Sequence, residues 1–224
     1  NVDGEYVNES RVAAIYDTPN EKSWLVALKE LGQMWQVDYT DIDNLRIDKM
    51  DTAKFLHDGF FDPTGRYFQI AANASNKMVV VDTKERKLEA LIDVDKLPHP
   101  GPGANWNDPT CGPVGGTTHL GVGKVTVWGN DPEKYADAAW KVCYEVQTDG
   151  PGLFIVKTLT VTSVPGQAAV HIEFNADGSE VWVSAWNMKD SKEPNGEIVI
   201  YDANTLEEKT RIKGLYAPTG KFNV

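Results

Sequence analysis

The chain of 224 residues has little of what several protein classes require. It contains two cysteines and four histidines, and it lacks an apolar run of about 18 residues, the length that a membrane span needs. We therefore expect no membrane span. Lys and Arg number 22 against 33 Asp and Glu, which gives a formal net charge of −11. Because such a chain repels phosphate backbones, we also expect no nucleic-acid partner.

The scarcity of cysteine limits the redox chemistry of the chain. Cys111 and Cys143 do not form a Cys-x-x-Cys motif, and no Cys-x-x-Cys-His haem attachment motif is present. Cys111 stands in a loop-like stretch and Cys143 in a strand-like one. Since small buried cysteines are common in protein cores, we interpret the pair as two free thiols in preference to a disulfide.

Several compact motifs of catalysis are also missing. No His-x-x-x-His spacing occurs, which argues against a zinc site contained in one segment. No Gly-x-Ser-x-Gly segment offers an acyl-transfer serine, and no glycine-rich loop is placed to hold phosphate groups. The sequence therefore gives no sign of these three kinds of site.

What the chain does contain is a series of short β-strands separated by turns. Two stretches repeat one order, in which a turn precedes three strands rich in Val, Ile, Tyr and Phe. The turns lie at 62–65 and 175–178, and the strands lie at 66–71, 77–82 and 87–93 and at 180–186, 197–202 and 207–213.

A polar marker ends one strand of each repeat and sets the period. The markers are Asp38, Asp82, Asn130 and Asp202, and the first two spacings are 44 and 48 residues. A period of about 40–50 residues with four strands per repeat is typical of β-propeller blades. We predict an all-β fold, part of a larger β-propeller with four to five blades, in which each marker caps the turn after its strand.

The third spacing departs from this period. From Asn130 to Asp202 it is 72 residues, too long for one blade and short for two. We interpret residues 1–224 as one partial propeller and expect missing residues near 158–165. The polar start of the chain, at 1–5, does not resemble a signal peptide, and we interpret it as an internal point.

The four histidines are the candidate reactive groups, and we expect all of them in loops: His57, His99, His119 and His171. His57 and His171 each precede a blade-opening turn, so we predict equivalent positions facing one central space. Pro98 and Pro100 flank His99 and restrict the backbone, as a rigid site requires. Imidazoles transfer protons near neutral pH and bind transition metals. The alternative is that each histidine only hydrogen-bonds a loop carbonyl.

A set of motifs distributed along the chain resembles one family. The segments are Phe55-Leu-His-Asp-Gly59, Ala71-Ala-Asn73, Pro98-His-Pro-Gly101, Gly103-Ala-Asn105, Gly112-Pro-Val114, Thr118-His-Leu-Gly121, Glu180-Val-Trp182, Trp186-Asn187 and Pro218-Thr-Gly-Lys-Phe-Asn223. Together they are similar to the haem d1 domain of cytochrome cd1 nitrite reductases. The resemblance runs from Arg11 to the end, and it implies the C-terminal half or slightly more of an eight-bladed propeller that holds haem d1.

The resemblance also implies an activity and a set of site residues. It implies periplasmic reduction of nitrite to nitric oxide, with His57 and His99 as distal histidines that donate protons to iron-bound nitrite. Ala14, His171, Thr219 and Gly220 match positions that line the haem. An electron-donor cytochrome c or cupredoxin is implied as a partner, and a homodimer stays open. Haem c and the proximal haem ligand would belong upstream of residue 1.

Two departures from the family pattern leave other functions open. Pro102 stands where the family has Arg, and His171 stands where it has Gln. With Tyr216 near the C-terminus, His171 makes the chain similar to the related dehydrogenase that completes haem d1. The second hypothesis is therefore a haem d1 biosynthesis protein, either dihydro-haem d1 dehydrogenase or a haem d1 carrier. A third is a non-enzymatic binding propeller, because this fold hosts many functions.

Overall fold

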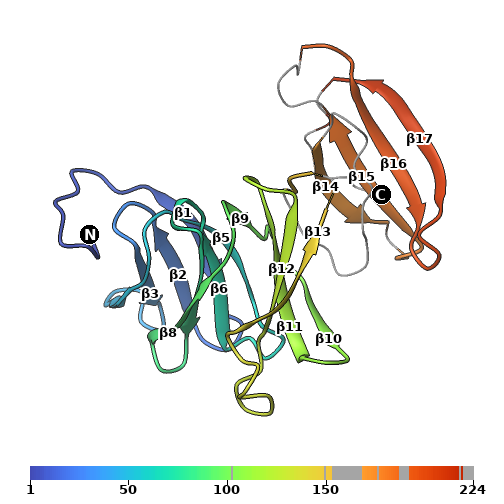
Figure 1. Ribbon diagram of the computed structural model, residues 1–224. Coiled ribbons are helices and arrows are strands. Elements are labelled where there is room, and N and C mark those ends of the chain that lie inside the picture. Colours follow the sequence, from blue (N-terminus) through green and yellow to red (C-terminus); the bar gives the residue numbers. More distant parts are fainter. Residues whose placement is uncertain are drawn as a thin grey trace.

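The computed structural model describes residues 1–101, 103–148, 150–152, 168–175, 177–186, 192–216 and 218. Its architecture is four antiparallel sheets in chain order, and Figure 1 shows the first three side by side with the fourth beyond them. Sheets of up-and-down strands confirm the predicted β-propeller fold, and the described residues contain four of its blades. No helix in the described residues is long and apolar enough to cross a membrane.

Blades 1 and 2 form the N-terminal half of the described structure. Blade 1 contains β1 (Val12–Asp17), β2 (Ser23–Leu28), β3 (Gln33–Asp38) and β4 (Arg46–Asp51). Blade 2 contains β5 (Leu56–Phe61), β6 (Tyr67–Ala72), β7 (Lys77–Asp82) and β8 (Lys87–Asp93), with the short 3-10 helix η1 (Asn73–Ser75) between β6 and β7. Each blade is a meander in which neighbours in sequence are hydrogen-bonded neighbours in the sheet.

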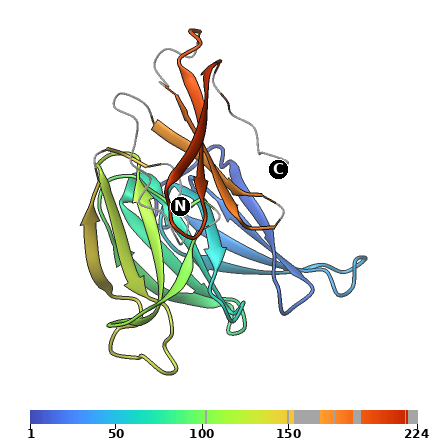
Figure 2. The same cartoon turned by 90° about the vertical axis from the view of Figure 1, so that its right-hand side faces the viewer.

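Blades 3 and 4 repeat this meander with changes at their edges. Blade 3 contains β9 (Pro98–His99), β10 (Asn105–Asp108), β11 (Gly112–His119), β12 (Lys124–Gly129) and β13 (Val142–Gln147). Blade 4 contains β14 (Ala168–Phe174), β15 (Glu180–Trp186), β16 (Gly196–Asp202) and β17 (Glu208–Leu215). Figure 2 shows the blades fanning out when the molecule is turned by 90°. The suspected interruption near 158–165 lies outside the described residues.

Three of the four polar markers cap a turn, whereas the sequence predicts a cap at each of them. The carboxylate of Asp82 accepts hydrogen bonds from the backbone N–H of Lys84 and Glu85, at 3.0 and 3.1 Å. Asp38 and Asp202 cap the turns after β3 and β16 in the same way. Asn130 is the exception, because the next residue accepts these bonds in blade 3. Such side-chain acceptors replace the ladder bonds that a strand loses where it ends.

The core lies between the blades. One cluster packs β2 and β3 against β6 and β7, with Leu25, Met34 and Phe68 fully buried. A second packs blade 2 against Trp128 of β12, whose indole N–H donates to Gln69 at 2.6 Å. β5 contacts both β1 and β2, and β9 contacts β6. The first strands of blades 1 and 2 therefore lie against each other, and the first strand of blade 3 lies against the second strand of blade 2.

The interpretation of the cysteines as free thiols is wrong. Cys111, in the turn between β10 and β11, forms a disulfide with Cys143 of β13, and their Cα atoms are 6.4 Å apart. The ladder between β12 and β13 shifts register at Cys143, because Val127 pairs with Tyr144 and Trp128 with Val142. Cys143 is the extra residue of a β-bulge, which redirects a side chain. A strand-like stretch of sequence does not reveal this shift.

Candidate functional site

The first strand of three blades carries a bulge close to its start. In β5, Leu56 pairs with Ala72 and Gly59 with Ile70, so His57 and Asp58 together oppose a single residue. β1 and β14 shift register in the same way, between Val12 and Ala14 and between Ala169 and His171. Each bulge lies opposite the last residues of the second strand of its blade. Bulges are common next to active sites because they redirect side chains.

In blade 3 the first strand is interrupted more strongly, also opposite the end of the neighbouring strand. Its first strand is divided into β9 and β10, and β9 places His99 opposite Thr118 near the end of β11. His99 thus lies opposite the end of the neighbouring strand, as the bulges of β1, β5 and β14 do in the other blades. Ala14, His57, His99 and His171 each stand on the first strand of a blade. His57 lies within the bulge of β5, whereas His171 follows the bulge of β14 and pairs with Ser184, so the equivalence of the two histidines stays a prediction. The side chain of His171 lies outside the described residues.

The expectation that the histidines lie in loops is wrong. All four belong to strands: His57 to β5, His99 to β9, His119 to β11 and His171 to β14. These strands begin with irregular pairing, which tolerates polar residues. In the sequence, the same polar residues suggest loops. His119 is fully buried, its Nε2 lies 2.9 Å from the Thr126 hydroxyl, and burial lowers its pKa. His119 is therefore a neutral core residue.

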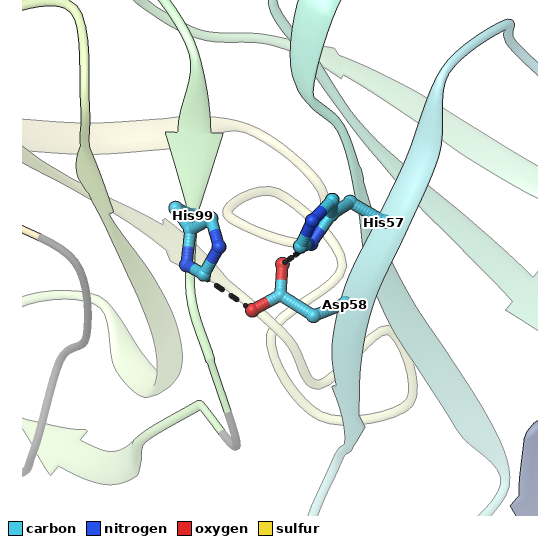
Figure 3. Close-up of side chains that lie close together, drawn as sticks. All are labelled: His57, Asp58 and His99. Atoms are coloured by element: carbon cyan, nitrogen blue, oxygen red, sulfur yellow. Dashed lines mark hydrogen bonds and ion pairs between the residues drawn. The ribbon is translucent and has the colours of Figure 1, made fainter. Parts of the chain in front are cut away.

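The structure brings His57 and His99 together around Asp58 (Figure 3). Nδ1 of His57 lies 3.2 Å from Oδ1 of Asp58, and Nδ1 of His99 lies 3.3 Å from Oδ2 of the same carboxylate. The ring centroids of the two histidines are 4.8 Å apart. Neighbouring residues of a regular strand point to opposite faces. The β5 bulge accounts for the contact between His57 and the residue that follows it.

Neighbouring backbone and side chains fix both segments. The Gly59 N–H donates to the hydroxyl of Tyr16 on β1 at 3.0 Å, which ties the bulge to blade 1. His99 is held by two threonines: its N–H donates to the Thr117 hydroxyl at 3.1 Å, and its carbonyl accepts from Thr118 at 2.9 Å. These bonds come from packed strands, so the two imidazoles are anchored on rigid elements.

The loop after His99 depends on glycine. Gly103 has φ of 74°, and a Cβ there would overlap the ring of Phe60 on β5. The loop therefore lies directly against the strand that carries the other histidine. This approach explains the glycine at 103 that the sequence shows beside the candidate site.

Exposure differs between the paired residues. The His57 side chain is 40% exposed, against 17% for Asp58 and 9% for His99. His57 can therefore meet a ligand or solvent, while Asp58 and His99 support it from within. Asp58 is the functional candidate that the sequence reasoning did not single out. Its position next to His57 was the available signal.

The remaining predicted cofactor residues are only partly described. Ala14 is half-buried on β1 and packs against the core between blades 1 and 2. Thr219, Gly220 and Pro102 lie outside the described residues. Tyr216 follows β17 and is 67% exposed. Of the predicted haem-lining residues, the structure therefore describes Ala14 in full and His171 in its backbone alone.

The residues present fit either a metal ion or a flat cofactor. Ligand atoms of His57, Asp58 and His99 lie within 4.8 Å of one another, although Asp58 and His99 are far apart in sequence. Two imidazoles and a carboxylate are ligands for several transition metals. The imidazole of His57, whose side chain is 40% exposed, could also contact a flat cofactor such as haem d1.

Comparisons with known proteins identify the family. The family model described as Cytochrome D1 heme domain matches residues 1–159 and 155–224. A nitrite reductase of Stutzerimonas stutzeri is 40% identical over 274 residues, covering 100% of this chain and 48% of the relative. The dihydro-heme d1 dehydrogenase of Pseudomonas aeruginosa is 28% identical, covering 96% of this chain and 47% of the relative.

A solved structure supports the same assignment. The dihydro-heme d1 dehydrogenase NirN, solved in complex with DHE, matches with a TM-score of 0.72 and 26% identity, covering 96% of this chain and 49% of that one. The chain thus spans about half the length of the curated relatives it matches. With its four radial sheets and its paired histidines, the chain belongs to the cytochrome D1 heme domain family.

Proposed function

We propose that this chain forms the haem d1 part of an enzyme that reduces nitrite to nitric oxide. The observation that carries the proposal is the pair of imidazoles, His57 and His99, held on one carboxylate at the start of two inner strands. The 40% identity to a nitrite reductase supports the same activity. Nitrite, one electron and two protons give nitric oxide and water, so the reaction needs two proton donors beside the substrate.

His57 and His99 supply these protons in the proposal. Haem d1, when bound, supplies the binding site for nitrite and passes on the electron. Two protonated imidazoles attract the nitrite anion and then each release one proton to the oxygen that leaves as water. The exposed ring of His57 meets the substrate directly, and the more buried His99 lies 4.8 Å away between ring centroids. Ala14, His171, Thr219 and Gly220 are proposed to line the cofactor.

The disulfide supports the proposed compartment. Disulfides persist in oxidising compartments such as the bacterial periplasm and are rare in the cytosol. The Cys111–Cys143 bond therefore agrees with a periplasmic enzyme. A cytochrome c or cupredoxin is the proposed electron donor.

A haem d1 biosynthesis role is the second candidate. The match to the NirN structure favours it, together with His171 on the first strand of blade 4. Under this candidate the same site would take dihydro-haem d1 as its substrate and remove two hydrogens from a side chain of the macrocycle, with two protons released to the site and two electrons passed to a one-electron carrier protein. His171 would then lie beside the group that is oxidised.

One experiment separates the two candidates. The protein of which this chain is part is reconstituted with haem d1, and nitric oxide formation from nitrite is measured beside oxidation of dihydro-haem d1. We expect nitrite turnover, and we expect His99→Ala and His57→Ala each to lower it by about 100-fold or more, the usual contribution of a general acid. The exposed-turn variant Asp43→Ala is the control. Normal turnover after His99→Ala would refute its role, and dehydrogenation without nitrite turnover would select the second candidate.

A further inference from the structure

We propose that Asp58 is a positioning residue that holds a proton on Nδ1 of both His57 and His99. The carboxylate shares its two oxygens between the rings, so it directs the other ring nitrogen, Nε2, of each histidine to the reaction. The catalytic consequence rests on the proposed function, whereas the arrangement of protons is a property of the protein alone.

The contacts of Asp58 favour this role. Oδ1 faces Nδ1 of His57 at 3.2 Å, and Oδ2 faces Nδ1 of His99 at 3.3 Å. A carboxylate only accepts hydrogen bonds, so a neutral imidazole beside it carries its proton on the nitrogen that faces it. Figure 3 shows the carboxylate between the two rings, one oxygen directed to each.

The ion-pair contacts around Asp58 show which groups share its negative charge. Within the described ranges, the ion-pair contacts of Asp58 are those with His57 and His99, and no Lys or Arg contacts it. Its negative charge also reaches Tyr16, whose pKa is raised by burial and, to a smaller degree, by Asp58. Tyr16 therefore keeps its proton while its oxygen accepts the Gly59 N–H and holds the bulge in place.

The Asp58 carboxylate also reduces the electrostatic repulsion between the two histidines. This repulsion arises because the proposed reaction needs both rings to be protonated. Two imidazolium rings with centroids 4.8 Å apart repel each other, which opposes the state in which both hold a donatable proton. A negative charge between them lowers this cost. Asp58 thus places one negative charge beside both of the proposed proton donors.

Asn is the informative replacement because it keeps the shape of Asp. An amide offers one acceptor and one donor group, so it can match an Nδ1–H on one ring only, and the ring that faces its NH2 must carry its proton on Nε2. Asp58→Asn therefore changes the tautomer of at least one histidine without removing side-chain volume. Asp43→Asn, in an exposed turn, is the matched control.

The tautomers are measured by 15N NMR of the protein labelled at histidine, without haem, at alkaline pH where the imidazoles are neutral. We expect His57 and His99 to carry the proton on Nδ1, and we expect at least one ring to move it to Nε2 in Asp58→Asn and neither in Asp43→Asn. A proton on Nε2 of either ring in the unaltered protein would overturn the proposal, and this measurement needs no variant to fold.

A second measurement tests whether the histidine tautomers affect the proposed reaction. After haem d1 reconstitution, Asp58→Asn should lower nitric oxide formation by about 10-fold or more, while the haem absorption spectrum stays unchanged. Unaltered turnover would overturn the catalytic consequence. If neither protein reduces nitrite but the tautomers respond as expected, the proposed function fails and the positioning role of Asp58 stands.

Discussion

At the scale of single residues, the site depends on one irregular step in a strand. A regular β5 would send His57 and Asp58 to opposite faces of the sheet, and the bulge instead opposes both to one residue of β6. The Tyr16 hydroxyl fixes that bulge through the Gly59 N–H at 3.0 Å. Tyr16, a residue of blade 1, is therefore coupled to the proposed proton donors in blades 2 and 3.

Replacing Tyr16 by Phe tests this coupling. The Gly59 N–H then loses its acceptor, and a buried unsatisfied donor costs about 1–3 kcal/mol. We expect Tyr16→Phe to lower the free energy of unfolding in urea by that amount and to reduce nitrite turnover. Tyr6→Phe, at a side chain that is 89% exposed, should change neither.

His119 gives a pH dependence with a definite sign. Its folded-state pKa lies below the ordinary value near 6.5 because the ring is buried. As the pH falls through that ordinary value, the unfolded chain takes up a proton that the folded chain does not, so stability decreases. We expect His119→Gln to flatten the decline in stability between neutral and mildly acid pH, measured by urea unfolding at several pH values. An unchanged decline would show that other groups cause it.

The sequence indicates the candidate histidines better than it indicates their setting. The resemblance to the haem d1 domain family selects His57 and His99 from the four histidines, and the prolines that flank His99 agree with that choice. Their strands were missed because a bulge and a split strand interrupt the alternation that marks a regular strand. Asp58 was missed because acidic residues are abundant here, 33 in all, and nothing in the composition separates one from the others.

At the scale of elements, blade 3 departs most from the common meander. Its first strand is divided, and the loop between β9 and β10 packs Gly103 onto Phe60. We expect Gly103→Ala to destabilise the protein by about 1–3 kcal/mol, since added volume meets a ring and the backbone has positive φ. It should also displace His99 and lower turnover. Thermal unfolding and the nitrite assay measure the two effects, and an unaltered melting temperature would contradict the packing described.

The disulfide joins the first hairpin of blade 3 to its outer strand. It closes a loop between cysteines 32 residues apart, so its loss should cost about 2–4 kcal/mol. We expect this loss in urea unfolding with a reducing agent, and a similar loss in the Cys111→Ser and Cys143→Ser double variant. Equal stability of oxidised and reduced protein would contradict a structural role. The sequence could not reveal the bond, because two cysteines in a β chain give no sign of the bulge that orients one of them.

At the scale of the whole molecule, the repeat period was the most informative feature. The markers Asp38, Asp82 and Asp202 each end the third strand of a blade, because a turn cap is needed wherever that strand stops. The long spacing between Asn130 and Asp202 is less well explained. The alignment with the nitrite reductase spans 274 positions while the chain has 224 residues, so at least 50 positions have no residue here.

An interruption of the chain stays a prediction. We propose that most of these unmatched positions fall near 158–165, where the two matched segments of the family model meet at 155–159. Fifty positions amount to about one blade at the observed period of 44 to 48 residues. Intact-mass measurement of the native protein, with peptide mapping across this stretch, is expected to show an added segment of that size. A peptide that runs directly from residue 150 to residue 170 would contradict it.

The irregular starts of the first strands have a consequence for how such a protein can change. Each bulge absorbs its extra residue within its own blade, so the pairing of the other blades does not depend on which side chain stands there. The ring offers the same kind of position several times, filled here by Ala14 in one blade and by histidines in others. A different side chain at one of these positions can therefore be accommodated within one blade, without any change in the strand pairing of the others.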